Sequence, residues 1–179
     1  NNNIEIAKFL LNNSKIDVNE KLYSQFTDVT ALSIAVEKNY IEIAELLLNK
    51  PEINVNLVLE SDFSTKTLLF FAIENERHEI VKLMLNNPSI EINQKSIIKN
   101  KYDTDENEII IENAEKTALS LAVENNLMQI MEYLLSNKDI DINIKLKYHK
   151  SINNKFVDIE ETAFHIAVIN NKIDIIKVL

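Results

Sequence analysis

Apolar residues recur along this chain in a fixed register behind four threonines, Thr30, Thr67, Thr117 and Thr162. Each threonine opens a short apolar stretch that reads TALSIAV, TLLFFAI, TALSLAV or TAFHIAV. A second apolar stretch follows, with pairs thirteen and fourteen residues after the threonine, at Ile43–Ala44, Ile80–Val81, Ile130–Met131 and Ile175–Ile176. In both stretches the apolar residues fall on one side of a helix. The pattern predicts a unit of two short helices joined by a tight turn, repeated four times.

The predicted first helix of each unit carries signals for its start and its end. The threonine is a suitable N-cap, because its hydroxyl can accept a hydrogen bond from a backbone N–H of the first turn. Asn39, Asn126 and Asn171 stand where the helix should end in a left-handed residue, a conformation that asparagine tolerates. Glu76 holds this place in the second copy, so we expect that turn to be strained or slightly shifted.

Extended segments connect the units. Each second helix is followed by a similar exit, INVN at 53–56, IEIN at 90–93 and IDIN at 140–143, and a half unit ending in IDVN at 16–19 precedes the first threonine. The longest connector alternates apolar and polar residues and is predicted to form strands around 97–98 and 109–111 with a turn at 103–107. The next is predicted to form strands at 144–148 and 156–159 with a turn at 151–154. Both connectors are therefore expected to be β-hairpins.

Composition limits the classes of function. The chain has 179 residues, 46% of them hydrophobic, but no run of 18 apolar residues and no visible signal peptide. It has no cysteine, which excludes a thiolate metal site or nucleophile and fits a reducing compartment. The formal net charge of -9 repels phosphate backbones. We predict an intracellular protein, in the cytoplasm rather than the nucleus, with no membrane and no nucleic-acid partner.

Residues that could carry chemistry form no recognisable constellation. Without glycine the chain has no glycine-rich phosphate loop and no Gly-x-Ser-x-Gly elbow. His78, His149 and His165 lie in different units without metal-ligand spacing, and His165 is expected to bond Thr162 or nearby backbone. The segment 102–108, YDTDENE, resembles a calcium loop but lacks its glycine and its final glutamate, which favours a solvated hairpin tip. We predict no enzyme activity, no cofactor and no metal site.

The repeated pattern resembles the ankyrin repeat. That family opens its unit with Thr-Pro-Leu-His-x-Ala; here the threonine and alanine are kept, the proline is missing throughout, and the histidine occurs once, as His165. The leucine position holds Leu32, Leu69, Leu119 and Phe164. The apolar pairs of the second helix and the Asp-Val-Asn exit also match, so the resemblance covers the whole chain. Successive threonines are 37, 50 and 45 residues apart, more than the usual ~33, and the excess falls mainly in the connectors.

The resemblance implies an all-α solenoid of stacked helix-turn-helix, ankyrin-type repeats, with the connectors projecting as β-hairpin fingers. We predict a single ankyrin-repeat domain over residues 1–179. Its parts are a half repeat at 1–29, repeats at 30–66, 67–116 and 117–161, and a truncated repeat at 162–179.

The resemblance also implies a concave groove, formed by the first helices and the finger tips, that binds a partner. The positions that face it are the residue before each threonine and the seventh and eighth residues after it. Three of the seventh residues are glutamates, which the helix dipole disfavours at a helix C-terminus, so a ladder facing a cationic or hydrogen-bonding partner is one interpretation. A solvated face copied along duplicated repeats is the other. The candidate partner-binding residues are Glu37, Lys38, Lys66, Glu74, Asn75, Lys116, Glu124, Asn125, Glu161 and Asn170.

Aromatic residues in the connectors form a second candidate surface. They are Tyr23, Phe26, Phe63, Tyr102, Tyr148 and Phe156. Such residues either anchor a partner or pack one finger against the next.

We predict a non-catalytic protein–protein interaction module that binds a protein partner through the concave helix face and the hairpin fingers. Two alternatives are a regulatory or targeting domain of a larger enzyme, such as a kinase or ubiquitin ligase, and a structural spacer.

Overall fold

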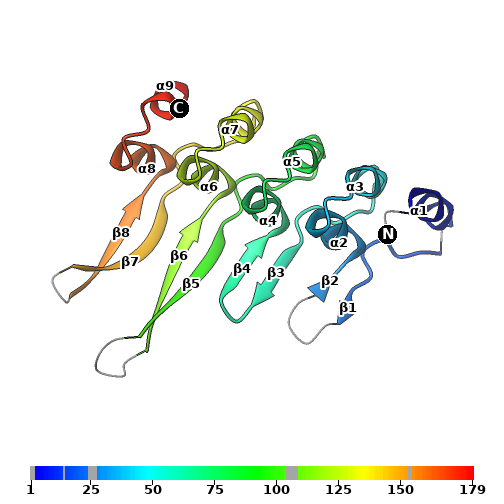
Figure 1. Cartoon of the computed structure of the whole chain (residues 1–179), viewed down its shortest axis with the longest axis horizontal. Helices are drawn as coiled ribbons and strands as arrows, with labels where there is room; N and C mark the ends of the chain where they lie inside the picture. The colour runs from blue at the N-terminus through cyan, green and yellow to red at the C-terminus, as the bar shows by residue number, and fades with distance from the viewer. Residues whose placement is uncertain (1–2, 14, 24–27, 104–108, 153–154) are drawn as a thin grey trace.

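The computed structural model describes residues 3–13, 15–23, 28–103, 109–152 and 155–179. Its helices stand in pairs along one row, and hairpins project from one side of that row (Figure 1). The described helices are α1 (Ile4–Leu11), α2 (Ala31–Glu37), α3 (Ile41–Leu48), α4 (Leu68–Glu74), α5 (His78–Leu85), α6 (Ala118–Glu124), α7 (Met128–Leu135), α8 (Ala163–Ile169) and α9 (Ile173–Val178). Helices α2, α4, α6 and α8 lie between the other helices and the hairpins (Figure 1). The predicted stack of helix-turn-helix units with hairpin fingers is confirmed.

The hairpins are antiparallel and are joined in part into a larger sheet. The described strands are β1 (Leu22–Tyr23), β2 (Asp28–Val29), β3 (Val58–Ser61), β4 (Ser64–Thr67), β5 (Ser96–Asp103), β6 (Ile109–Lys116), β7 (Leu146–Ile152) and β8 (Lys155–Glu161). Strands β3 to β6 form one sheet, because β4 pairs with β5 through Ser64↔Ile98 and Thr65↔Ile97, whereas β1–β2 and β7–β8 are separate pairs.

Both predicted long hairpins are confirmed, but the bounds of their strands differ from the predicted ones. In the first, the pairing runs from Ser96↔Lys116 to Asp103↔Ile109, so Asp103 belongs to β5 rather than to the turn, and residues 104–108 lie outside the described part. In the second, β7 begins at Leu146 rather than at 144, and it continues to Ile152, so residues 151 and 152 belong to the strand rather than to the predicted turn. The apolar alternation marked the strand centres, whereas backbone pairing continues through polar residues.

The first helix of each pair is capped by its threonine. In α2, α6 and α8 the capping is reciprocal, because the side chain of Ser33, Ser120 or His165 also accepts a bond from the threonine N–H. The expected bond of His165 is confirmed, since its Nδ1 lies 2.8 Å from the Thr162 hydroxyl. Helix α4 differs, because Phe70 stands at the equivalent position and cannot accept a hydrogen bond. There the buried Ser96 hydroxyl, at the start of β5, accepts the Thr67 N–H at 3.0 Å.

The turn between paired helices is left-handed in all four pairs, as predicted at three of them. The φ angle is 55° at Asn39, 59° at Asn126 and 52° at Asn171. Glu76 adopts the same conformation, with φ of 54°. Its N–H donates to the Ile73 carbonyl at 2.9 Å, in the register of the asparagine turns, so this turn is not shifted. Of the two outcomes expected at Glu76, the structure therefore shows the first, a glutamate held in the left-handed region that is unfavourable for its side chain.

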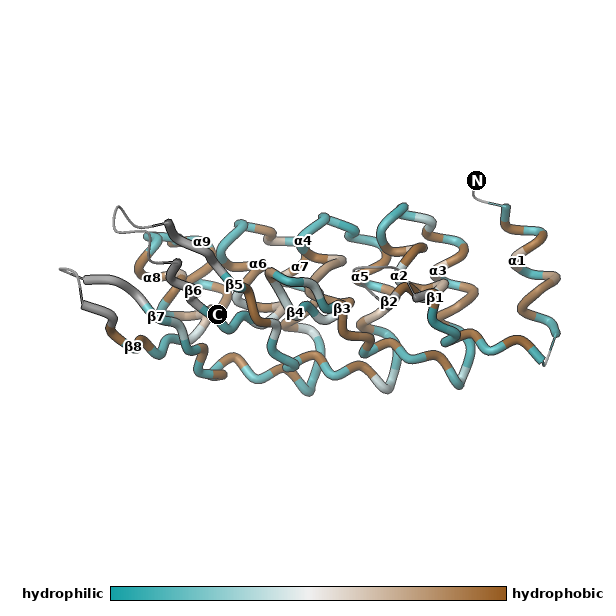
Figure 2. The backbone as a smooth tube through the Cα atoms, turned by 90° about the horizontal axis from the view of Figure 1, so that it is seen from below, coloured by the Kyte–Doolittle hydropathy of each residue, from teal (hydrophilic) through white to brown (hydrophobic). Residues whose placement is uncertain are grey.

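One continuous core fills the space between the helix rows. The alanine five residues after each threonine is fully buried at Ala35, Ala72, Ala122 and Ala167, and this small side chain lets neighbouring helices approach closely. Figure 2 shows the hydrophobic stretches along the helices and the hydrophilic ones at many of the turns.

Asparagine links join each unit to the next at the exits from the second helices. The Asn56 amide donates to the Ser89 carbonyl at 2.7 Å and accepts from the Glu91 N–H at 2.8 Å. Asn19 and Asn93 each make the same two bonds to the exit loop that follows, Asn19 with Glu52 and Asn54, and Asn93 with Asp139 and Asp141. Each link spans two units, so the exits are held in a fixed relative position.

Candidate protein-binding surface

Two of the predicted groove glutamates are held by lysines of the hairpins. The Lys66 Nζ lies 2.8 and 2.7 Å from the two carboxylate oxygens of Glu74, and the Lys116 Nζ binds the Oε2 atom of Glu124. The pairing arises because the strand before the cap threonine returns alongside the helix that follows it. The structure therefore brings predicted residues together, but each of these two glutamates is neutralised by its own lysine within the chain.

The first and last helix pairs lack this ion pair. Val29 stands before the cap in the first, and the Glu37 carboxylate contacts Lys38 Nζ at 2.6 Å. In the last, Glu161 stands before the cap and Ile169 ends the helix, with 70% of its surface exposed. Glu161 instead acts on the phenol of Tyr148. Burial and the interaction with the Glu161 carboxylate raise the pKa of Tyr148 to about 12.

The asparagines predicted to face the partner have local roles as well. Asn75 donates to the Phe71 carbonyl and Asn170 to the Ile166 carbonyl, both at 2.8 Å, at the C-terminal ends of their helices. Asn125 is exposed at the same position of α6. Their amides therefore complete helix ends that would otherwise need water.

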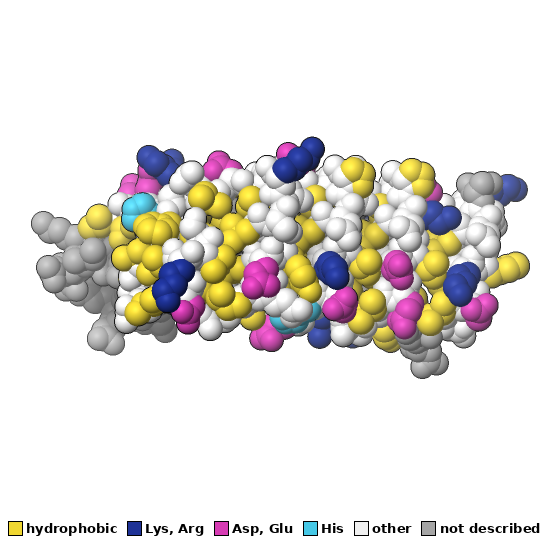
Figure 3. Space-filling model, turned by 90° about the horizontal axis from the view of Figure 1, so that it is seen from above, with side chains coloured by type: hydrophobic (Ala, Val, Ile, Leu, Met, Phe, Trp, Pro, Cys, Tyr) yellow, Lys and Arg dark blue, Asp and Glu magenta, His cyan; other side chains and the backbone are white. Residues whose placement is uncertain are grey.

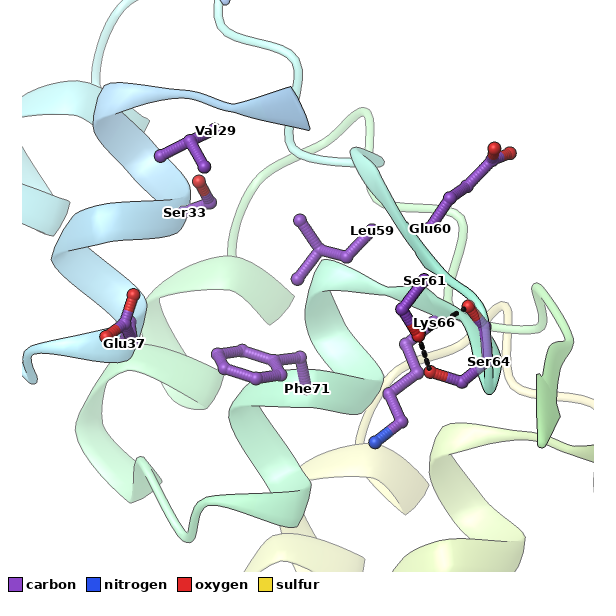
Figure 4. Close-up of a pocket in the computed structure, with 9 residues that line it drawn as sticks. All are labelled: Val29, Ser33, Glu37, Leu59, Glu60, Ser61, Ser64, Lys66 and Phe71. Atoms are coloured by element: carbon purple, nitrogen blue, oxygen red, sulfur yellow. Dashed lines mark hydrogen bonds between the residues drawn. The ribbon is translucent and has the colours of Figure 1, made fainter. Parts of the chain in front are cut away.

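A groove opens beside these residues, between α2, α4 and the β3–β4 hairpin (Figure 4). Its volume is about 330 Å³. It is lined by Val29, Ser33, Glu37, Leu59, Glu60, Ser61, Ser64, Lys66 and Phe71. Glu37 and Lys66 were among the predicted residues, whereas the apolar walls were not. Phe71 could have been noticed as an aromatic residue where the other units have Ile34, Leu121 and Ile166.

A salt-bridge cluster connects the two longest hairpins. Glu115 of β6 accepts from Lys95 Nζ at 2.7 Å and from the backbone N–H of Lys147, in β7, at 3.0 Å. Burial opposes ionisation of Glu115, but these two bonds outweigh it and lower its pKa. Glu115 thus connects β6 to β7, which are not paired in one sheet.

The predicted aromatic surface is described in part. Phe63, at the tip of the β3–β4 hairpin, is 55% exposed, and Tyr148 is half-buried against Glu161. The side chains of Tyr23, Phe26, Tyr102 and Phe156 lie outside the described residues.

The outer face of the helices carries scattered charges, with hydrophobic side chains gathered toward the C-terminal end (Figure 3). The exposed hydrophobic residues of α8 and α9 are Phe164, Val168, Ile169, Ile173 and Val178. A hollow of about 380 Å³ lies between the ends of α3 and α5, and two of the residues that line it are joined by a hydrogen bond, which the Asn87 amide donates to the Leu48 carbonyl at 3.2 Å.

Within the described ranges, no group of three or more His, Cys, Asp or Glu side chains could hold a metal ion. His149 pairs with Asp158 across the β7–β8 hairpin at 2.5 Å. The calcium-like segment lies largely outside those ranges. No described helix is both long and apolar enough to cross a membrane.

Comparison with known proteins agrees with this geometry. A model of ankyrin repeats in three copies matches residues 1–96 and 65–179. No curated protein matches the chain. The crystal structure of EF0377, an ankyrin repeat protein, superposes with a TM-score of 0.58 and 23% sequence identity over 93% of this chain and 67% of that one. The chain belongs to the ankyrin repeat family.

Proposed function

We propose that residues 1–179 form a non-catalytic interaction domain that binds a partner protein through its concave face. This face comprises α2, α4, α6 and α8 together with the adjoining hairpins. Ankyrin repeats are typically protein-interaction modules, which supports the general role. The observation that carries the specific proposal is the groove beside α2, because it combines apolar walls with a charged rim on the side where the hairpins meet the helices.

The rigidity of the stack supports this role. Reciprocal caps fix the start of α2, α6 and α8, and the asparagine links fix each unit against the next. A surface that is already ordered loses little conformational freedom when a partner binds. The candidate contact residues on this surface are Glu37, Lys38, Lys66, Glu74, Asn75, Lys116, Glu124, Asn125, Glu161 and Asn170.

The proposal can be tested by charge reversal on two faces. One variant changes Glu37, Glu74 and Glu124 to lysine on the concave face, and the matched control changes the exposed Glu42, Glu79 and Glu132 to lysine on the outer helices. The two variants carry the same net charge, so a difference between them reports location rather than overall electrostatics. Circular dichroism should first show that both retain the helical spectrum.

Each protein serves as bait against an extract of its own source, and bound proteins are identified by mass spectrometry. We expect a partner that binds the wild type and the outer-face control and is lost by the concave variant. A partner that binds all three equally would move the site to the hairpins. If no bait captures a partner, the result would contradict the proposed interaction domain and favour a structural spacer.

A further inference from the structure

The lysine that neutralises the groove glutamate in two helix pairs is replaced by valine in the first. Lys66 binds Glu74 at 2.7 Å, and Lys116 binds Glu124 in the equivalent geometry. Val29 occupies the same place before the α2 cap and cannot neutralise a carboxylate. Val29 and Glu37 both line the groove, so the Glu37 carboxylate borders it without a lysine from its own hairpin. Lys66 of the next hairpin also lines the groove, but its Nζ is bound to both carboxylate oxygens of Glu74.

The cation that Glu37 does contact is held loosely. Lys38 is its neighbour in the chain, and the two side chains are 55% and 52% exposed. An ion pair this accessible to water is screened and contributes little. Arg77 also approaches, but its Nη2 donates to the main-chain carbonyl of Glu37 at 3.0 Å rather than to the carboxylate. A cation from a partner can therefore replace Lys38 with small loss.

The groove wall beside this carboxylate is apolar. Val29, Leu59 and Phe71 contribute it, from β2, β3 and α4. In Figure 4 the Phe71 ring points from α4 toward the α2 side, where Glu37 lies. The volume of about 330 Å³ is at the lower end of the ~300–1,000 Å³ range of ligand pockets, which suits an inserted side chain rather than a whole cofactor.

We propose that this groove binds an arginine side chain of the partner protein, an inference that rests on the interaction function proposed above. The aliphatic stem would lie against Leu59 and Val29, and the guanidinium would reach the Glu37 carboxylate and the face of the Phe71 ring. Arginine suits this site better than lysine, because its planar fork binds a carboxylate in two places and stacks on aromatic rings. The net charge of -9 attracts such a segment from solution.

The structure supplies matched variants for a test. Val29→Lys installs before α2 the residue found before α4 and α6, so Glu37 becomes internally paired and the groove loses an apolar wall. The control, Val178→Lys, makes the same exchange at an exposed position of α9, away from the groove. Val29→Lys places before α2 the residue that two other units carry there, and the Val178 side chain is 45% exposed, so both variants are expected to fold, which circular dichroism and a urea titration verify.

The probe is a phage-displayed library of random dodecapeptides, selected on the wild-type chain, with the selected peptides then synthesised and their affinities measured by calorimetry. We expect the peptides to share an arginine. Val29→Lys, Glu37→Gln and replacement of that arginine by neutral citrulline should each weaken binding by about tenfold or more, the loss of one hydrogen bond to a charged group. The control Val178→Lys should bind the same peptides as well as the wild type does.

Two other outcomes overturn the inference and are distinguishable. Peptides that bind Val29→Lys as well as the wild type, or that tolerate citrulline, would leave the interaction domain standing and remove the arginine site. A selection that yields no binder would count against the interaction function and the arginine site together.

Discussion

Two buried positions, one in the first turn of a helix and one at the start of the following hairpin, carry a polar and an apolar residue in opposite order in the α4 and α6 units. At α6, Ser120 completes the cap and the buried Leu146 begins the following hairpin. At α4, Phe70 stands at the serine position and Ser96 at the leucine position. The hydroxyl has moved from helix to hairpin and still receives the threonine N–H, here that of Thr67. We predict that Phe70 and Ser96 are strongly coupled in stability.

Each single change should be costly, because Phe70 is 1% exposed and Ser96 is fully buried. Ser96→Leu leaves the Thr67 N–H without its acceptor, at about 1–3 kcal/mol. It also adds a large side chain beside Phe70, at about another 1–3 kcal/mol. Phe70→Ser removes a ring from the core, and such large-to-small changes cost about 3–5 kcal/mol.

The double variant recreates the serine–leucine arrangement of α6 and should be more stable than either single variant. The new serine at 70 caps the helix, and the new leucine at 96 occupies space that the ring vacates. We expect a coupling energy of at least about 2 kcal/mol, measured from urea unfolding of the four proteins by circular dichroism. If the two single effects add to within about 0.5 kcal/mol, the exchange is coincidental and the reasoning is wrong.

Three further predictions follow from other contacts. Replacing Glu76 by Asn should stabilise the chain by about 0.5–1 kcal/mol, because asparagine tolerates the left-handed turn; a lower melting temperature would contradict this. The Tyr148 phenol should ionise near pH 12 in the folded chain and at pH ~10 in the unfolded chain, so the stability that its protonated form contributes is complete below pH ~10 and is lost as the pH rises toward about 12. Ultraviolet titration of the wild type against Tyr148→Phe measures this pKa, and Glu161→Gln should lower it. Asn56→Ala removes two bonds between units and should cost about 1–3 kcal/mol, with faster amide exchange at Glu91 as the local sign.

The helix pairs were predictable because their signals are local. The threonine caps, the buried alanines and the left-handed asparagines each depend on residues within one unit, and repetition made the register visible. The same reasoning anticipated the strain at Glu76, although not that the turn would keep its geometry.

The rest depends on contacts across the sequence. Ser96 caps a helix that begins 29 residues earlier, and no local pattern connects the two. The Lys66–Glu74 ion pair requires the hairpin to return alongside its helix, so the glutamate ladder seen in the sequence gave no indication that two of its members are neutralised. The apolar walls of the groove were missed for the same reason, because Leu59 and Phe71 meet only in the folded stack.

The asparagine links have an evolutionary consequence. Each consists of one amide and the backbone of the next exit loop, so nothing in it depends on which two units it joins. A gene that gains or loses a whole unit therefore keeps every remaining link, whereas an insertion that changes the register breaks one. Arrays of this kind can change in length by duplication while the spacing of their surface positions, and hence the pattern that a partner recognises, is preserved.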